Sequence, residues 1–141
     1  MNKTQLTEHF SLDEMIRSDR AVLNCIDNTP TSEKIIVNLK SLCTNVLEPA
    51  RIALNQPIHI SSGYRCRTLN YIVGGSHVSQ HILGQAADLI LKGDHQYDDA
   101  LWNALLSTPF DQLILERNRR SGNKWIHVSY SPYNRRQIIK Q

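Results

Sequence analysis

The stretch from Ser79 to Asp88 constrains this chain more than any other, because it sets an imidazole and a carboxylate seven positions apart around a glycine. A second imidazole, His127, follows much later. His81, Asp88 and His127 would give a zinc ion three nitrogen and oxygen ligands and leave one tetrahedral position open for water, which is typical of catalytic zinc. However, the chain has six histidines, and an isolated histidine is more often packed or exposed than metal-bound. The pattern of the flanking residues is therefore needed to distinguish a metal site from a chance pairing.

The segments that carry the candidate ligands are both predicted to be strands. Apolar residues alternate with the candidate ligands over residues 86–91 and 124–130, so each ligand should face away from the core-seeking side chains. Gly84 fits a bend that lets His81 and Asp88 converge. The flanking pattern therefore favours a metal site over a chance pairing.

The motif resembles that of the zinc D-alanyl-D-alanine peptidase family, in which Ser-x-His-x-x-Gly-x-Ala-x-Asp is paired with a later Trp-x-His. The matching residues are Ser79, His81, Gly84, Ala86 and Asp88, with Trp125 and His127. Residues 58–65 are similar to the family's substrate-side Ser-Gly-Tyr-Arg segment, and residues 111–116 to the strand before the last ligand. The resemblance spans about residues 6–136 and is closest to small single-domain members from phages and bacteria.

This resemblance implies an α+β, hedgehog/D,D-peptidase-like fold, with a small antiparallel sheet flanked by helices. One zinc ion would lie at the sheet face on His81, Asp88 and His127, and peptidoglycan stem peptides would be the substrate. D,D-carboxypeptidase, crosslink endopeptidase and L-alanyl-D-glutamate endopeptidase activities all occur on this motif set, so the bond cleaved stays open. The alternatives are a zinc-binding, non-catalytic recognition module of the same fold and a nonenzymatic phage structural protein with a degenerate copy.

Three residues are candidates for substrate binding. The planar guanidinium of Arg65 suits bidentate capture of a carboxylate, and the resemblance places a substrate-binding arginine here; otherwise Arg65 is a solvated turn residue. The match of Ser79 to the family's serine implies a hydrogen bond to substrate, although a serine here would also simply terminate a turn. Gln112 is the third candidate, because strand periodicity places it on the metal side.

Glu116 is the candidate general base. Residues 111–116 and 124–130 should form an antiparallel hairpin, with Leu113 and Leu115 on its core face, so the period of two puts Glu116 on the face of His127. The vancomycin-resistance dipeptidases that share the motif place their catalytic glutamate three residues before the last histidine, where this chain has Lys124. The alternative for Glu116 is a strand-end carboxylate that neutralises Arg117.

Length and composition favour one small domain, residues 1–141, with its own core. Three cysteines without C-x-x-C spacing indicate neither a disulfide set nor a thiolate zinc site, and Cys25 is expected to be buried. Neither a signal peptide nor a membrane span is predicted. We therefore expect a monomer, soluble and cytoplasmic as synthesised, that binds no nucleic acid or membrane. The resemblance implies action on the cell wall, after holin-mediated release if the protein is a phage endolysin.

The remaining elements are predicted to be scaffold. A capping box at Ser11 begins a short helix that ends near Ser18, and a long apolar-faced helix runs from about residue 33 to 55, kinked or restarted at Pro49. Shorter helices are expected over residues 67–73 and 97–106, and His77 is expected to be exposed. The net charge of +3 is too small to indicate nucleic-acid binding. The cations of residues 117–120 and of the tail (Arg135, Arg136, Lys140) are interpreted as solvated, with attraction to an anionic polymer as the alternative.

Overall fold

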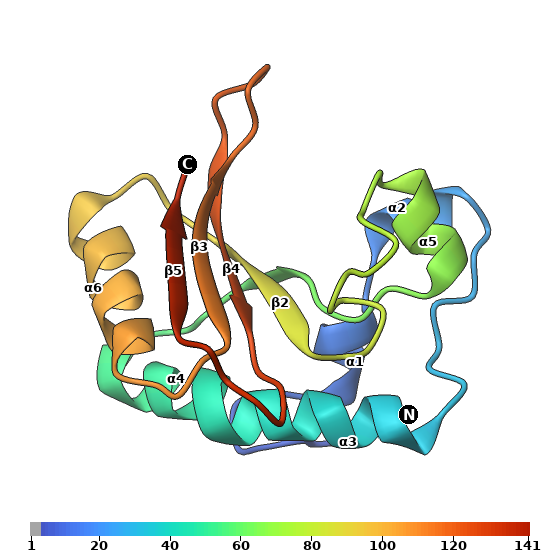
Figure 1. Ribbon diagram of the computed structural model, residues 1–141, viewed down its shortest axis with the longest axis horizontal. Coiled ribbons are helices and arrows are strands. Elements are labelled where there is room, and N and C mark those ends of the chain that lie inside the picture. Colours follow the sequence, from blue (N-terminus) through green and yellow to red (C-terminus); the bar gives the residue numbers. More distant parts are fainter. Residues whose placement is uncertain (1–3) are drawn as a thin grey trace.

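The computed structural model describes residues 4–141 and has a five-stranded sheet at its centre, in the order β1-β2-β4-β3-β5 (Figure 1). The strands are β1 (Ile60–Ser62), β2 (Ala86–Ile90), β3 (Gln112–Arg117), β4 (Lys124–Ser129) and β5 (Gln137–Lys140). The helices are α1 (Leu12–Ile16), α2 (Asp19–Leu23), α3 (Glu33–Leu42), the π-helical turn η1 (Cys43–Leu47), α4 (Glu48–Leu54), α5 (Arg67–Ile72) and α6 (His95–Leu106). The expected α+β class is confirmed.

Strands β1 to β4 pair antiparallel, whereas β5 pairs parallel with β3. The prediction of an antiparallel sheet is therefore right for four strands and wrong for the fifth. In the hairpin of β3 and β4, Ile114 lies opposite His127 and Glu116 opposite Trp125, so these residues share one face as expected. Alternation along these strands buries Leu113, Ile126 and Val128 and leaves the opposite face to the site.

Helices α3 and α4 form one long rod beneath the sheet, because η1 joins them without a break (Figure 1). Ser32 caps the rod at its start, and Asn55 ends it in the left-handed conformation at φ 54°. Pro49 lies in the first turn of α4, directly after the π turn η1. A proline lacks the N–H and its ring crowds the preceding carbonyls, and the wider π turn relieves that crowding. The helix does not restart at Pro49; the π turn is the local irregularity near the predicted kink.

The core lies between the rod, the sheet and α6, which the view in Figure 1 places at the left of the strands. Phe10, Met15, Leu42, Leu89 and Phe110 are among its fully buried side chains. The capping box at Ser11 is present, and it orients α1 so that Met15 packs into this core. Helices α2 and α5 lie at the right of the view in Figure 1, on the side away from α6. None of the helices among residues 4–141 is long and apolar enough to span a membrane.

Two features near the N-terminus were not predicted. The first helix ends at Ile16, close to the expected end near Ser18, but the chain then begins a second helix, α2, for which Ser18 is the cap. Cys25 is exposed rather than buried. It adopts the left-handed conformation just past the end of α2 (φ 54°), where the Ile26 N–H bonds back to the Ala21 carbonyl. A residue in that cap position directs its side chain outward.

The tail cations anchor the chain end and are not simply solvated. Arg135 pairs with the buried Asp111 at 2.8 Å. The Arg136 guanidinium donates to main-chain carbonyls at the end of α6 and lies 4.5 Å from the centroid of the Phe110 ring. Lys140 lies 5.2 Å above the ring of Trp102. These contacts hold β5 against the sheet, beyond residue 136, where the resemblance to the family ends.

Candidate active site

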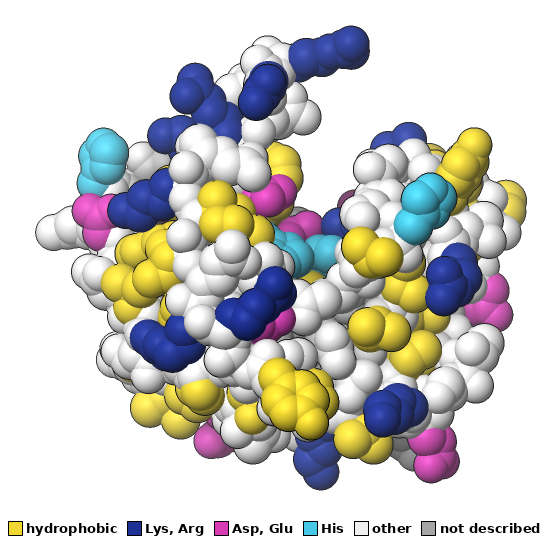
Figure 2. All heavy atoms as spheres, in the orientation of Figure 1, with side chains coloured by type: hydrophobic (Ala, Val, Ile, Leu, Met, Phe, Trp, Pro, Cys, Tyr) yellow, Lys and Arg dark blue, Asp and Glu magenta, His cyan; other side chains and the backbone are white. Residues whose placement is uncertain are grey.

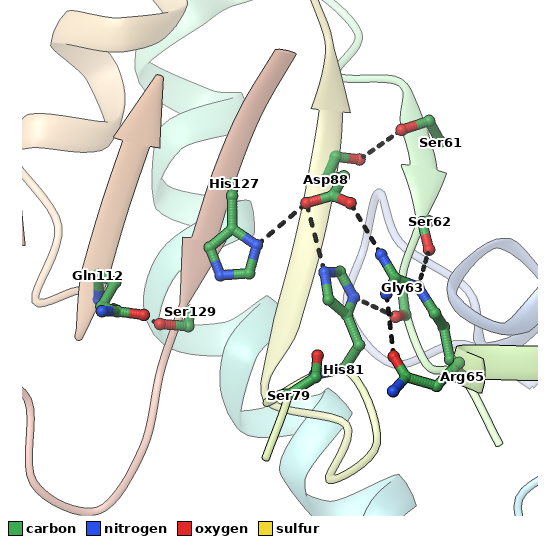
Figure 3. Close-up of polar contacts among 11 residues, drawn as sticks. Ser61, Ser62, Gly63, Arg65, Ser79, His81, Asp88, Gln112, His127 and Ser129 are labelled. Atoms are coloured by element: carbon green, nitrogen blue, oxygen red, sulfur yellow. Dashed lines mark hydrogen bonds and ion pairs between the residues drawn. The ribbon is translucent and has the colours of Figure 1, made fainter. Parts of the chain in front are cut away.

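Three side chains from the central part of the sheet and the loop before it converge on one point. Asp88 of β2 lies directly opposite His127 of β4, and His81 reaches them from the loop that precedes β2 (Figure 3). Asp88 Oδ1 is 3.0 Å from His127 Nδ1 and 3.3 Å from His81 Nε2. The three ligand atoms lie within 4.8 Å of one another. This is the spacing of atoms that share one metal ion, and the structure thus brings the predicted ligand set together.

The hydrogen bonds of His81 fix which nitrogen faces the site. Its Nδ1 is 2.7 Å from the carbonyl oxygen of Gly63. A carbonyl can only accept, so Nδ1 donates to it, and Nε2 is the nitrogen that faces Asp88. Metal-binding histidines usually donate their second N–H in this way. The imidazole is also 3% exposed, so its orientation is set by packing as well.

Asp88 is buried and remains a carboxylate. Burial alone raises the pKa of Asp88, but the His81 imidazole and the hydrogen bonds from His127 and His81 outweigh burial and hold that pKa far below its usual range. Arg65 Nη2 also donates to the second oxygen, Oδ2, at 3.2 Å. One oxygen therefore faces the histidines while the other is held by a guanidinium, as Figure 3 shows. Two imidazoles and one anionic oxygen form a donor set that fits zinc.

Arg65 makes more internal contacts than a solvated turn residue would. Besides Asp88, its Nε donates to Ser62 Oγ at 3.0 Å and its Nη1 donates to Asn70 Oδ1 at 3.1 Å (Figure 3). A guanidinium has five N–H donors, so these three bonds leave one N–H on each terminal nitrogen. Arg65 lines the cleft and holds the Asp88 carboxylate, and two of its N–H groups make no hydrogen bond within residues 4–141.

Asn28 is a site-building residue that the sequence analysis missed. Its side-chain amide, in a residue that is 8% exposed, donates to the Ile16 and Tyr64 carbonyls at 2.8 and 3.0 Å, and its oxygen accepts from Cys66 N–H at 2.8 Å. It therefore holds the main chain on both sides of Arg65. No sequence motif marks Asn28, because its partners are 12, 36 and 38 positions away.

Two glycines pack too tightly for any side chain. A Cβ on Gly63 would overlap the Met15 carbonyl oxygen, and a Cβ on Gly75 would overlap the Asn70 amide and lie 2.9 Å from Arg65 Nη1. Asn70, 3% exposed, also donates to the Ser76 carbonyl at 2.9 Å. The loop after α5 is thus fastened to the Arg65 side chain.

The triad lies on the floor of an open cleft of about 640 Å³. Figure 2 shows this hollow between two projecting parts of the surface, with histidine side chains at its floor. One wall is the loop after α5, including Val73 and Val78, and the other wall comes from β3 and β4. An extended ligand can therefore reach the triad from solvent.

Glu116 lines the cleft, as the hairpin parity predicted. Glu116 lies two residues beyond Ile114, which is the residue opposite His127. Two residues of strand span about 7 Å, so Glu116 is displaced from His127 by about that distance along the sheet. Lys124, which occupies the position of the glutamate in the vancomycin-resistance dipeptidases, does not line this cleft. Of the two positions, only 116 places a carboxylate in the lining of this cleft.

Ser79 and Gln112 also line the cleft. Ser79 Oγ accepts from the His81 main-chain N–H at 3.2 Å, so the serine shapes the turn that carries a ligand. The Gln112 amide donates to Gln137 Oε1 at 2.7 Å, and its main-chain N–H bonds to Ser129 Oγ. Both side chains border the space a substrate would fill. His77 is exposed, as expected.

Comparison with known families gives a match to the Peptidase M15 model over residues 8–129 of 141. The chain belongs to the peptidase M15 family. The matched region of this M15 chain contains the triad, Arg65 and Glu116, and it ends at the last residue of β4. No curated protein matches the chain.

Proposed function

We propose that this M15 chain is a zinc metallopeptidase that hydrolyses amide bonds of peptidoglycan stem peptides. The observation that carries the proposal is the convergence of two imidazoles and one carboxylate oxygen at the floor of an open cleft. M15 membership supports a peptidase. A non-catalytic recognition module would also use the metal site, but it would have no need for the Glu116 carboxylate in the cleft.

His81, Asp88 and His127 would hold the zinc ion. A bound zinc ion supplies Lewis acidity, which activates a water molecule and polarises an amide carbonyl. The histidines are kept in place by the Gly63 carbonyl and the sheet register, and Asp88 is kept ionised by its neighbours. The Gly63 carbonyl and the sheet register thus orient the side chains that would bind the metal.

Glu116 would accept and donate the protons of the reaction. We assign it the role of general base toward water and of general acid toward the leaving amine, because it is the carboxylate that the hairpin parity brings to the cleft wall. A positioned acid or base contributes about a hundred- to ten-thousandfold in rate. Arg65, with two N–H groups still free for a ligand, would bind a substrate carboxylate or carbonyl, and Ser79 and Gln112 would border the bound peptide.

Glu116→Gln tests this assignment. The amide preserves size and hydrogen bonding but cannot take a proton, so kcat on stem peptides should fall at least about a hundredfold while zinc content and stability persist. Glu8→Gln, an exposed carboxylate outside the cleft, is the matched control and should change nothing. Mass spectrometry of digested muropeptides identifies the bond that is cleaved.

The other outcomes separate the alternatives. A Glu116→Gln protein that cleaves at the wild-type rate would remove Glu116 from the mechanism, and one that loses zinc would make Glu116 a ligand. A wild-type protein that binds zinc and stem peptides without cleaving them would instead be a recognition module.

A further inference from the structure

A second hollow of about 590 Å³ adjoins the catalytic cleft, and the two hollows share Trp125 in their lining. Its other lining residues include Ser61 of β1, Ile90 of β2 and the segment Gly122–Lys124 that leads into β4. They come from the same strands as the triad. The second hollow is thus a continuation of the cleft along the sheet.

The floor of this second hollow follows the register of β2 and β4. Ile90 lies opposite Trp125, as Asp88 lies opposite His127 two residues earlier along β2. Both pairs face the same side of the sheet, and two residues of strand span about 7 Å. Ile90 is 43% exposed, so it forms an apolar floor together with Trp125. An extended peptide bound at the triad would reach this floor with the residue two positions further along.

The charge at the walls of this hollow is positive. Lys92 and Lys124 line it, and Asp98 is the carboxylate in its lining. Both Asp98 oxygens already accept main-chain N–H groups, from Lys92 at 2.9 Å and from Gly93 at 3.0 Å. Lys124 is exposed and takes part in none of the ion pairs among residues 4–141. An incoming anion would therefore find an unpaired ammonium group.

We propose that this hollow is a second substrate subsite, which binds an extended peptide segment carrying a carboxylate about two residues from the bond that is cleaved. Trp125 and Ile90 support the peptide, and Lys124 pairs with the carboxylate. This inference rests on the proposed peptidase function, since it takes the triad as the point of cleavage. It makes the enzyme selective for acidic over neutral segments at that distance.

The test uses zinc-loaded protein and synthetic pentapeptide stems whose carboxylates are either free or individually amidated. Wild-type kcat/KM should fall by up to about fivefold when the carboxylate near the subsite is amidated, which is the upper end for an exposed ion pair. Lys124→Gln should remove this preference while it keeps zinc content and melting temperature. Arg119→Gln is the matched control, because it removes the same charge from the same hairpin but does not line the subsite.

Equilibrium binding of the same peptides, measured by fluorescence anisotropy, separates this inference from the proposed function. Cleavage and binding that ignore the carboxylate, or an equal loss in Arg119→Gln, would overturn the subsite. Lys124-dependent binding of acidic peptides that are never cleaved would uphold the subsite and refute the peptidase.

Discussion

Replacing Asn28 by alanine should damage the site from outside the cleft. The Asn28 amide makes three hydrogen bonds of 2.8 to 3.0 Å, two to carbonyls and one from the Cys66 N–H. Two of the three fasten the residues on either side of Arg65. Because Asn28 is 8% exposed, water can replace these bonds only in part, and the main-chain groups of residues 16, 64 and 66 lose their partner.

The expected cost follows from these three bonds. A buried group that loses its partner costs about 1–3 kcal/mol, and partial access of water favours the lower end for each. The free energy of unfolding should therefore fall by about 3 kcal/mol in Asn28→Ala. Zinc affinity should fall with it, since a loosened Arg65 no longer holds the second oxygen of Asp88.

Urea unfolding of the metal-free protein gives the stability change, and competition with a chelator gives the zinc affinity. Asn24→Ala is the matched control, because the Asn24 amide makes one exposed hydrogen bond, to the Arg20 carbonyl at 2.8 Å, and Asn24 does not line the cleft. It should cost less than about 1 kcal/mol. A loss below that value in Asn28→Ala, with unchanged zinc affinity, would refute the reasoning that Asn28 builds the site.

Three further outcomes are expected. Arg65→Lys should lower both kcat/KM and zinc affinity, because an ammonium cannot hold three partners in a plane; unchanged kinetics on stem peptides and unchanged chelator competition would return Arg65 to a turn role. Burial raises the pKa of the Cys43 thiol to about 12, so iodoacetamide at pH 8 should label the exposed Cys25 and leave Cys43 unlabelled until urea is added, as mass spectrometry would show. The hydrogen bonds from Arg135 hold the pKa of Asp111 below its usual range, so the pair stabilises the fold above the unfolded pKa of about 4 and this contribution is lost as the pH falls through the lower folded value. Urea unfolding between pH 7 and pH 3 should therefore show a steeper loss for the wild type than for Asp111→Asn.

Local periodicity was enough to predict the part of the site that lies on strands. The alternation of Leu113 and Leu115 with Glu116 predicted the cleft-facing side of β3, and the register confirms it. The ligand motif likewise specified its own bend, because Gly84 adopts φ 74° and leaves no room for a Cβ beside Ile35. Such features depend on residues that are close in sequence or that lie in one hairpin, so a sequence pattern is enough to predict them.

The parts that escaped prediction depend on partners far away in sequence. Asn28 lies in a loop and Asn70 in helix α5, and the importance of both comes from main-chain groups that only the folded chain brings near. Arg135 was interpreted as a solvated tail cation because its partner, Asp111, is 24 positions earlier. Strand β5 has only four residues and pairs in parallel, so neither a turn nor a long alternation marks it.

The placement of β5 also affects how the protein meets other chains. The two outer strands of the sheet, β1 and β5, have three and four residues, whereas β3, which β5 covers, has six. An exposed strand edge offers unpaired main-chain groups to any other extended segment, and short edges limit such pairing. The last residues of the domain thus protect a longer edge from edge-to-edge association, and an expression design that removes them would create a protein prone to aggregation without touching a single residue of the cleft.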